Sequence, residues 1–240
     1  LPRCRFVLRA THELFGQTDE ATLGEEAKFY PCSTEGIAHV AAFELTRHFR
    51  RDHGLHASVA ILFPHASPRS VADHPLRRIS AEVARIKLGI EGRVRVDDLC
   101  RRVDWSHTAD CAHALWLMAQ AETGDDFVLA TGQTNTIRET LHMAFSCVGL
   151  SFWPHVQLDR NEAEIAATTL LMGDAAKANR RLGWARSRRF KEIVVEMVRQ
   201  DMEKLAGRPL ELQAWRRAKD SERIRETETD TVVELVPVER

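Results

Sequence analysis

Two groups of polar residues have the types and the spacing that acid–base chemistry uses. His12 and Glu13 follow Thr11, which places an imidazole and a carboxylate beside a hydroxyl group. Glu35 and His39 lie four residues apart, so a helix would carry both on one face. Such groups also occur as surface ion pairs and helix caps. Local chemistry therefore leaves a structural and a catalytic interpretation open.

Other patterns point away from metal and phosphate-loop chemistry. The histidines are scattered, and no Gly-rich phosphate loop occurs in the 240 residues. The five cysteines are odd in number, widely spaced and form no Cys-x-x-Cys pair. We therefore expect no metal site, and free thiols in a reducing cytoplasm.

The charge balance argues against two classes of partner. Lys and Arg number 34 and Asp and Glu 35, for a net charge of −1. A chain without a net field is not expected to bind nucleic acid or anionic lipid. No apolar run approaches the ~20 residues of a membrane span. We expect a cytoplasmic globular protein.

Predicted strands alternate with predicted helices along the chain. Strands are expected at residues 5–10, 57–63 and 127–131, and the second is an apolar run typical of a strand buried on both faces. Ser33 or Thr34 can cap a helix that runs to about His53 and that Gly54 ends. The alternation predicts an α/β fold with a parallel sheet.

Several segments, in one order over roughly residues 5–205, carry a family resemblance. They are Thr-His-Glu-Leu-Phe-Gly at 11–16, Phe-Tyr-Pro at 29–31, His-Ala-Ser-Pro-Arg at 65–69, Ala-Arg-Ile-Lys-Leu-Gly at 84–89, Asp-Trp-Ser-His at 104–107, Leu-Ala-Thr-Gly at 129–132 and Leu-Gly-Trp at 182–184. Together they resemble GDP-mannose 4,6-dehydratase, a family of extended short-chain dehydrogenases.

The resemblance implies a lyase that uses NADP and a GDP-mannose-type nucleotide sugar. In the family, NADP takes hydride from C4 of mannose, water is eliminated across C5 and C6, and the hydride returns to C6. The product, GDP-4-dehydro-6-deoxy-mannose, leads to GDP-fucose. A Thr orients the sugar and a Glu acts as acid–base. A Tyr, its pKa lowered by a Lys four residues on, removes the C4 hydroxyl proton. A Gly-rich turn holds the cofactor pyrophosphate.

The carried-over catalytic set is incomplete. Thr11 matches the family Thr and Glu13 the family Glu, so these are the expected catalytic residues. Glu35 stands at the Tyr position and His39 at the Lys position. Tyr30 is the chain's one tyrosine, but it belongs to the separate Phe-Tyr-Pro motif. A glutamate, with a reference pKa of ~4.3, is far from the base that a sugar hydroxyl needs. We expect this chain alone to be inactive.

Positions that hold ligands in the family have also changed. His65 keeps a cofactor-contacting histidine, but Pro64 replaces the preceding Asn. The paired arginines that reach a neighbouring subunit's cofactor are reduced to Arg69. Val103 and Glu164 stand where the family has nucleotide-binding arginines. His65 and Arg69 are thus the expected cofactor-binding residues, and NADP is not expected to bind this chain alone.

The resemblance sets the expected domains. Residues 1–206 match the C-terminal part of an NAD(P)-dependent epimerase/dehydratase-like domain, that is, a partial Rossmann-like parallel sheet with a small helical substrate-domain portion. Residues 207–240 are expected to form a charged C-terminal tail. The chain begins at Leu1, without the first half of the family fold. The strand at 5–10 should then lack a neighbour, which predicts a fragment, a split product or an oligomer that covers this edge.

Three functions remain open from the sequence. In the first, the chain is a catalytically inactive member that regulates an intact homologue. In the second, it is an active dehydratase whose cofactor-binding half comes from a missing segment or a partner. In the third, it is a non-enzymatic interaction module that uses the basic stretches at 186–191 and 216–219. The helix after Ser33 packs between subunits in the family. A homo-oligomer, or a hetero-oligomer with an intact homologue, is therefore expected.

Overall fold

The computed structural model describes residues 4–159 and 171–207. The expected tail at 207–240, except Gly207, lies outside the described residues, as do Glu164 and the basic stretch at 216–219.

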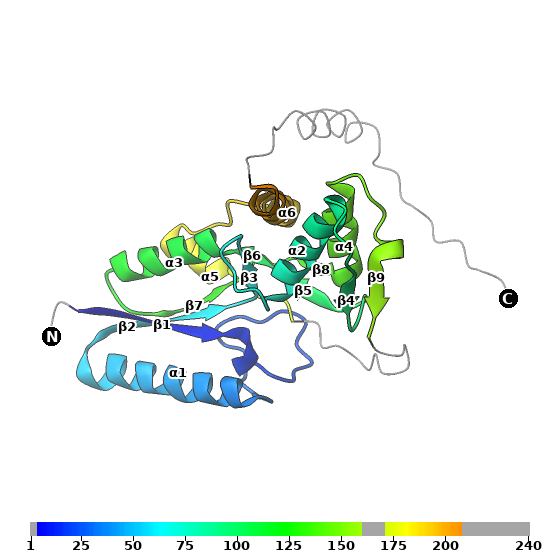
Figure 1. Ribbon diagram of the computed structural model, residues 1–240. Helices are drawn as coiled ribbons and strands as arrows, with labels where there is room; N and C mark the ends of the chain where they lie inside the picture. Colours follow the sequence, from blue (N-terminus) through cyan, green and yellow to red (C-terminus); the bar gives the residue numbers. More distant parts are fainter. Residues whose placement is uncertain (1–3, 160–170, 208–240) are drawn as a thin grey trace, which may run out of the picture.

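A parallel sheet forms the centre of the described fold (Figure 1). Its strands are β1 (Arg5–Thr11), β2 (His56–Leu62) and β7 (Asp126–Leu129), in the order β1-β2-β7. Ala10 pairs with Ile61, and Leu62 pairs with Leu129. The apolar run of β2 is buried on both faces, as its sequence predicts. The α/β fold class and its partial Rossmann-like sheet are confirmed.

Helices cover both faces of this sheet (Figure 1). Helix α1 (Thr34–His53) packs on one face, and α3 (Thr108–Gln120) and α5 (Ala176–Leu182) pack on the other. The predicted ends of α1 are confirmed. The Ser33 hydroxyl accepts a hydrogen bond from the Gly36 amide, and Gly54 ends the helix in the left-handed conformation with φ 61°. Buried aromatic side chains fill the α1 side of the core, among them Phe15, Phe43 and Phe63.

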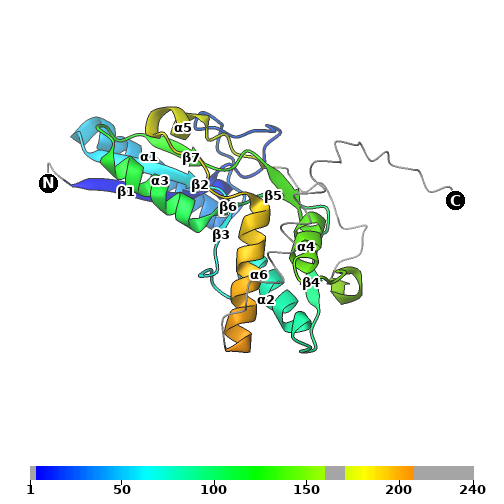
Figure 2. The same cartoon turned by 90° about the horizontal axis from the view of Figure 1, so that it is seen from above.

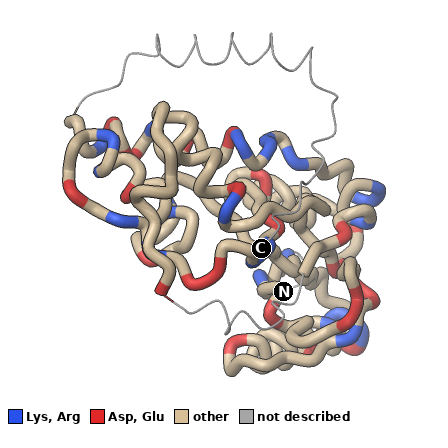
Figure 3. Tube along the Cα trace, turned by 90° about the vertical axis from the view of Figure 1, so that its right-hand side faces the viewer, with Lys and Arg blue, Asp and Glu red and all other residues tan. Residues whose placement is uncertain are grey.

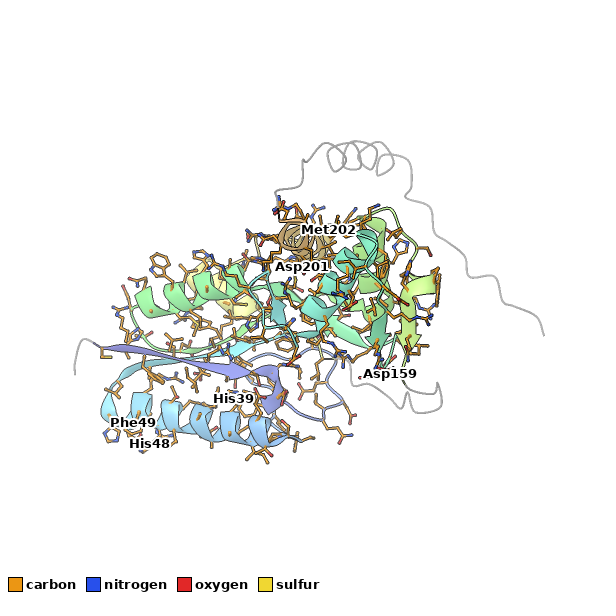
Figure 4. The ribbon with its side chains drawn as sticks, viewed as in Figure 1. His39, His48, Phe49, Asp159, Asp201 and Met202 are labelled. Atoms are coloured by element: carbon orange, nitrogen blue, oxygen red, sulfur yellow. The ribbon has the colours of Figure 1, made fainter. Side chains whose placement is uncertain are left out.

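A second, mostly helical region lies beside the sheet (Figure 2). It comprises α2 (Pro75–Lys87), α4 (Ile137–Ser146) and α6 (Phe190–Ala206), with the paired strands β4 (Val94–Val96) and β9 (Val156–Leu158). A buried ion pair between Arg77 and Asp201 joins α2 to α6, and Ser80 also donates to Asp201 at 2.7 Å (Asp201 is labelled in Figure 4). This region is the expected small helical portion.

Four short strands near the sheet were not predicted. β3 (His65–Ala66) pairs with β6 (Ser106–His107), and β5 (Arg102–Asp104) pairs with β8 (Thr134–Thr136). Elements of two or three residues contain no full hydrophobic period, so pattern analysis cannot detect them. They matter because they draw the segments around 65 and 105 together beside the ends of β1 and β2.

The two outer edges of the sheet differ. The carboxylate of Glu25 accepts a hydrogen bond of 2.8 Å from the Val128 amide of β7. Burial raises the pKa of Glu25, although the Val128 amide opposes this shift. On the other side, no strand of the described residues borders the outer edge of β1. Among the residues that the structure describes, β1 thus has the unpaired outer edge that the sequence led us to expect.

Surface properties of the described part agree with the charge balance. Basic and acidic residues are interspersed along the trace in Figure 3. No helix within residues 4–159 and 171–207 is long and apolar enough to cross a membrane. The five cysteines are unpaired, and Cys111 is buried.

Candidate ligand-binding cavity

A cavity of about 850 Å³ opens where β1 and β2 end. Most of its lining comes from the end of β1 with the two residues that follow it, the segment from Leu62 to Pro75, and the segment from Arg101 to Trp105. The carboxyl ends of parallel strands are where α/β folds bind ligands. All four residues expected at a site, Thr11, Glu13, His65 and Arg69, line this one cavity.

Helix α1 fixes the position of Glu13. The Ser33 hydroxyl, which also caps α1, donates a hydrogen bond of 2.5 Å to Glu13 Oε2. The start of α1 lies so close to Glu13 that a Cβ atom on Gly36 would come 2.6 Å from the Glu13 carbonyl oxygen. Only glycine permits this approach, and it holds the Glu13 backbone at the cavity wall.

The Glu35–His39 pair lies outside this lining. His39 Nε2 is 3.5 Å from Glu35 Oε1, as the four-residue spacing predicts (His39 is labelled in Figure 4). The Glu35 side chain is 59% exposed, and neither residue lines the cavity. The interpretation of this pair as a surface ion pair therefore fits the geometry better than that of a base.

Four guanidinium groups give the cavity a positive charge. Arg9, Arg69, Arg101 and Arg102 line it, and none of them forms an ion pair with another described residue. Charged groups without partners at a concave surface are typical of sites for ligands of opposite charge.

Two carboxylates, Glu13 and Asp104, also line the cavity, so the four arginines leave an excess of positive charge there. The Glu13 carboxylate accepts a hydrogen bond from the Ser33 hydroxyl. Asp104 accepts from the Thr131 amide at 2.9 Å and hydroxyl at 2.5 Å, from the Gly132 amide at 3.0 Å and from the Gly173 amide at 3.3 Å. Burial raises the pKa of Asp104, while these donors oppose the shift. The cavity thus suits an anion.

Three histidines line the cavity beside the arginines. Burial lowers the pKa of His12, His65 and His74. Glu13 and Glu35 oppose the shift at His12, and Arg9 reinforces it at His65. These imidazoles are therefore neutral at neutral pH and can accept hydrogen bonds.

Thr11 carries a free hydrogen-bonding group. Its Oγ1 is buried and has no hydrogen-bond partner among the described residues. Buried polar atoms are nearly always satisfied, so this hydroxyl is available to a bound molecule. Sequence reasoning thus identified Thr11 but missed Arg9, Arg101, Arg102 and His74. The adjacent Arg101 and Arg102, directly before Val103 and the Asp-Trp motif, were the signal that could have found two of them.

The residues present do not fit a complete nicotinamide dinucleotide site. His65 and Arg69 lie at the cavity, but no Gly-x-Gly-x-x-Gly or Gly-x-x-Gly-x-x-Gly turn occurs in the 240 residues to hold a pyrophosphate. Within the described part of the chain, no group of three or more His, Cys, Asp or Glu side chains could hold a metal ion.

Comparisons with known proteins agree on one family. A family model described as GDP-mannose 4,6 dehydratase matches residues 1–197. GDP-mannose 4,6 dehydratase 1 of Arabidopsis thaliana is 34% identical over 199 residues, which cover 83% of this chain and 55% of the relative. The human GDP-mannose 4,6 dehydratase is 33% identical over 222 residues, covering 85% of this chain and 60% of the relative. The chain thus spans little more than half the length of these relatives.

Solved structures share the fold. RMD from Pseudomonas aeruginosa, complexed with NADPH, superposes with a TM-score of 0.75 at 20% identity, covering 84% of this chain and 66% of that one. DesIV, a dTDP-glucose 4,6-dehydratase from Streptomyces venezuelae with NAD bound, superposes with a TM-score of 0.71 at 20% identity, covering 85% of this chain and 62% of that one. These likenesses show an extended short-chain dehydrogenase fold.

Proposed function

Since this chain belongs to the GDP-mannose 4,6-dehydratase family, we propose that it binds a GDP-mannose-type nucleotide sugar and that, alone, it does not complete the family reaction. The binding half of this proposal rests on the four arginines of the cavity, which form no ion pair with any residue that the structure describes. A diphosphate is a ligand that guanidinium groups bind through paired, charge-assisted hydrogen bonds. A cavity of about 850 Å³ is also within the range of small-molecule sites.

The chain retains the groups that would act on the sugar in an elimination. The unpartnered Thr11 hydroxyl can orient a sugar hydroxyl, and the Glu13 carboxylate, held by Ser33, can exchange a proton with it. NADP, where bound, would accept and return the hydride. Neither Glu35 nor His39 lines the cavity, so neither is placed to act as the family Tyr and Lys do. These two observations support a member that binds substrate but lacks the base for the first step.

Titration calorimetry tests the binding half. GDP-mannose is expected to bind the wild-type chain, and Arg102→Ala should weaken it about tenfold, because one charge-assisted hydrogen bond contributes roughly 1.5 kcal/mol or more. Arg95→Ala is the matched control, since Arg95 is exposed on β4 and lies outside the cavity lining. Equal losses in both variants, or no binding to the wild-type chain at millimolar GDP-mannose, would contradict the proposal.

The same preparation tests the catalytic half. NADPH titration followed by nicotinamide fluorescence should show no micromolar binding, and GDP-mannose incubated with NADP should stay unconverted. Conversion only after addition of an intact homologue would support the split-enzyme alternative, which the retained Thr11 and Glu13 favour. Conversion by the chain alone would overturn the proposal of an inactive member.

We further propose that the protein, in a reducing cytoplasm, associates through α1 with a second copy or with an intact homologue. The outward face of α1 carries three apolar side chains with large exposed fractions, Ile37 (59%), Leu45 (59%) and Phe49 (44%); Phe49 is labelled in Figure 4. Apolar groups that recur along one helix face and stay exposed are typical of an interface.

Sedimentation velocity tests this association. A dimer is expected at micromolar concentration, and Leu45→Glu should raise its dissociation constant about tenfold or more, because a carboxylate would lose its hydration at the interface. Leu205→Glu is the matched control, since Leu205 is 46% exposed on a different helix, α6. A dimer unaffected by Leu45→Glu would place the interface elsewhere, and a monomer at all concentrations would exclude self-association.

A further inference from the structure

His74 and Trp105 form a contacting pair in the cavity wall. His74 directly precedes α2, and Trp105 lies between β5 and β6. Their ring centroids are 5.4 Å apart with an interplanar angle of 59°. Both residues line the cavity, and Trp105 is 4% exposed. Neither side chain has a part in the proposed diphosphate binding or in the family reaction.

Each ring carries one buried nitrogen without a hydrogen-bond partner, Nδ1 in His74 and Nε1 in Trp105. The indole Nε1–H is a donor only. His74 Nε2 is not among the buried atoms without a partner, so the imidazole proton is assigned to Nε2. In the neutral imidazole, Nδ1 is then an acceptor. The cavity wall therefore contains, on two rings in contact, a donor and an acceptor that have no partner among the described residues.

This combination selects among ligand groups. A phosphate or carboxylate oxygen accepts only, so it would satisfy Trp105 and leave His74 without a partner. An ammonium group donates only, so it would satisfy His74 and leave Trp105 without a partner. A hydroxyl does both, because its oxygen accepts while its hydrogen donates. An unpaired buried donor or acceptor costs roughly 1–3 kcal/mol, so the pair favours a hydroxyl over the other groups.

We propose that His74 and Trp105 form a subsite for one sugar hydroxyl of the bound ligand, which accepts from Trp105 Nε1–H and donates to His74 Nδ1. This inference rests on the proposed function, which supplies the nucleotide sugar. The hydroxyl belongs either to the ribose or to the hexose, and both share the chemistry that the pair recognises. The arginines bind the anionic part of the ligand, whereas this pair forms hydrogen bonds with a hydroxyl of its sugar part.

Calorimetry with three probes tests the subsite, namely pyrophosphate, GDP and GDP-mannose. His74→Phe removes the acceptor and keeps an aromatic ring against Trp105. It should weaken GDP-mannose binding about tenfold and leave pyrophosphate binding unchanged. A matching loss for GDP assigns the ribose, and a loss confined to GDP-mannose assigns the hexose. His74→Asn keeps an acceptor near the position of Nδ1 and should restore most of the affinity.

The outcomes separate this inference from the proposed function. Absence of binding of any probe to the wild-type chain would contradict the proposed function itself. Binding of the probes with no selective effect of His74→Phe on GDP-mannose would overturn the subsite alone. A second measurement needs no variant at His74. The Trp105 indole N–H resonance, assigned by its loss in Trp105→Phe, should shift with GDP-mannose but not with pyrophosphate. An unshifted resonance in saturated protein would also overturn the subsite.

Discussion

Replacing Asp104 with alanine is expected to lower the free energy of unfolding by about 4 kcal/mol. The carboxylate is 1% exposed and collects hydrogen bonds from the Thr131 amide and hydroxyl and from the amides of Gly132 and Gly173. Alanine would leave these donors without a partner, at a cost of roughly 1–3 kcal/mol for each group that stays buried. Urea unfolding followed by circular dichroism measures the loss.

Two variants sharpen this prediction. Asp104→Asn keeps the shape and one acceptor oxygen, so it should lose less stability than Asp104→Ala. Asp19→Ala removes an exposed carboxylate and should leave the unfolding midpoint unchanged. A loss below about 1 kcal/mol in Asp104→Ala would mean that water replaces the carboxylate as acceptor.

Stability is expected to fall as the pH drops below about 6.5. Burial lowers the pKa of four histidines, namely His12, His65, His74 and His107. A lowered folded-state pKa means that the unfolded chain binds protons first, so stability rises with pH up to the unfolded value near 6.5 and is lost below it. Each such histidine contributes a slope of up to about 1.4 kcal/mol per pH unit. Urea midpoints measured from pH 5 to pH 8 would show this slope.

Histidine variants identify the source of the slope. His107→Asn removes one of the four groups and should reduce the slope by about one proton. His113→Asn, at an exposed position on α3, should leave it unchanged. Asp125 adds a loss only at lower pH, because burial raises its pKa but the hydrogen bonds from Lys177 and the Asp126 amide outweigh burial and hold the pKa below its usual value. Glu25 and Asp104, whose pKa burial raises, act in the opposite direction. Midpoints that stay flat between pH 5 and pH 8 would show that these imidazoles titrate normally.

The long elements of this fold could be predicted because each carries several hydrophobic periods or a clear end signal. Ser33, Gly54 and the apolar run of β2 fixed the limits of α1 and the central strand to within a residue or two. Helix α2 begins at Pro75, where proline occupies the first turn without losing a hydrogen bond. The strands β3, β5, β6 and β8 exist only because of tertiary pairing.

Part of the candidate site could be predicted from the sequence. Thr11, Glu13, His65 and Arg69 were identified through the family resemblance, and they meet at one cavity. Their catalytic and cofactor roles stay predictions. The arginines at 9, 101 and 102 were missed because an exposed arginine has no signature in sequence that separates a ligand contact from a solvated side chain. Only the convergence of β1 with the segment before Trp105 makes them one group.

The two unequal edges of the central sheet limit how this chain can aggregate. A foreign strand can pair its backbone with the outer side of β1, which no described strand borders. Beside β7 it would have to displace Glu25 from the Val128 amide and leave a half-buried carboxylate without this donor. Fibril growth by strand addition needs two open edges on every molecule. With only one, addition stops at a closed pair, so misassembly of this sheet favours dimers over fibrils.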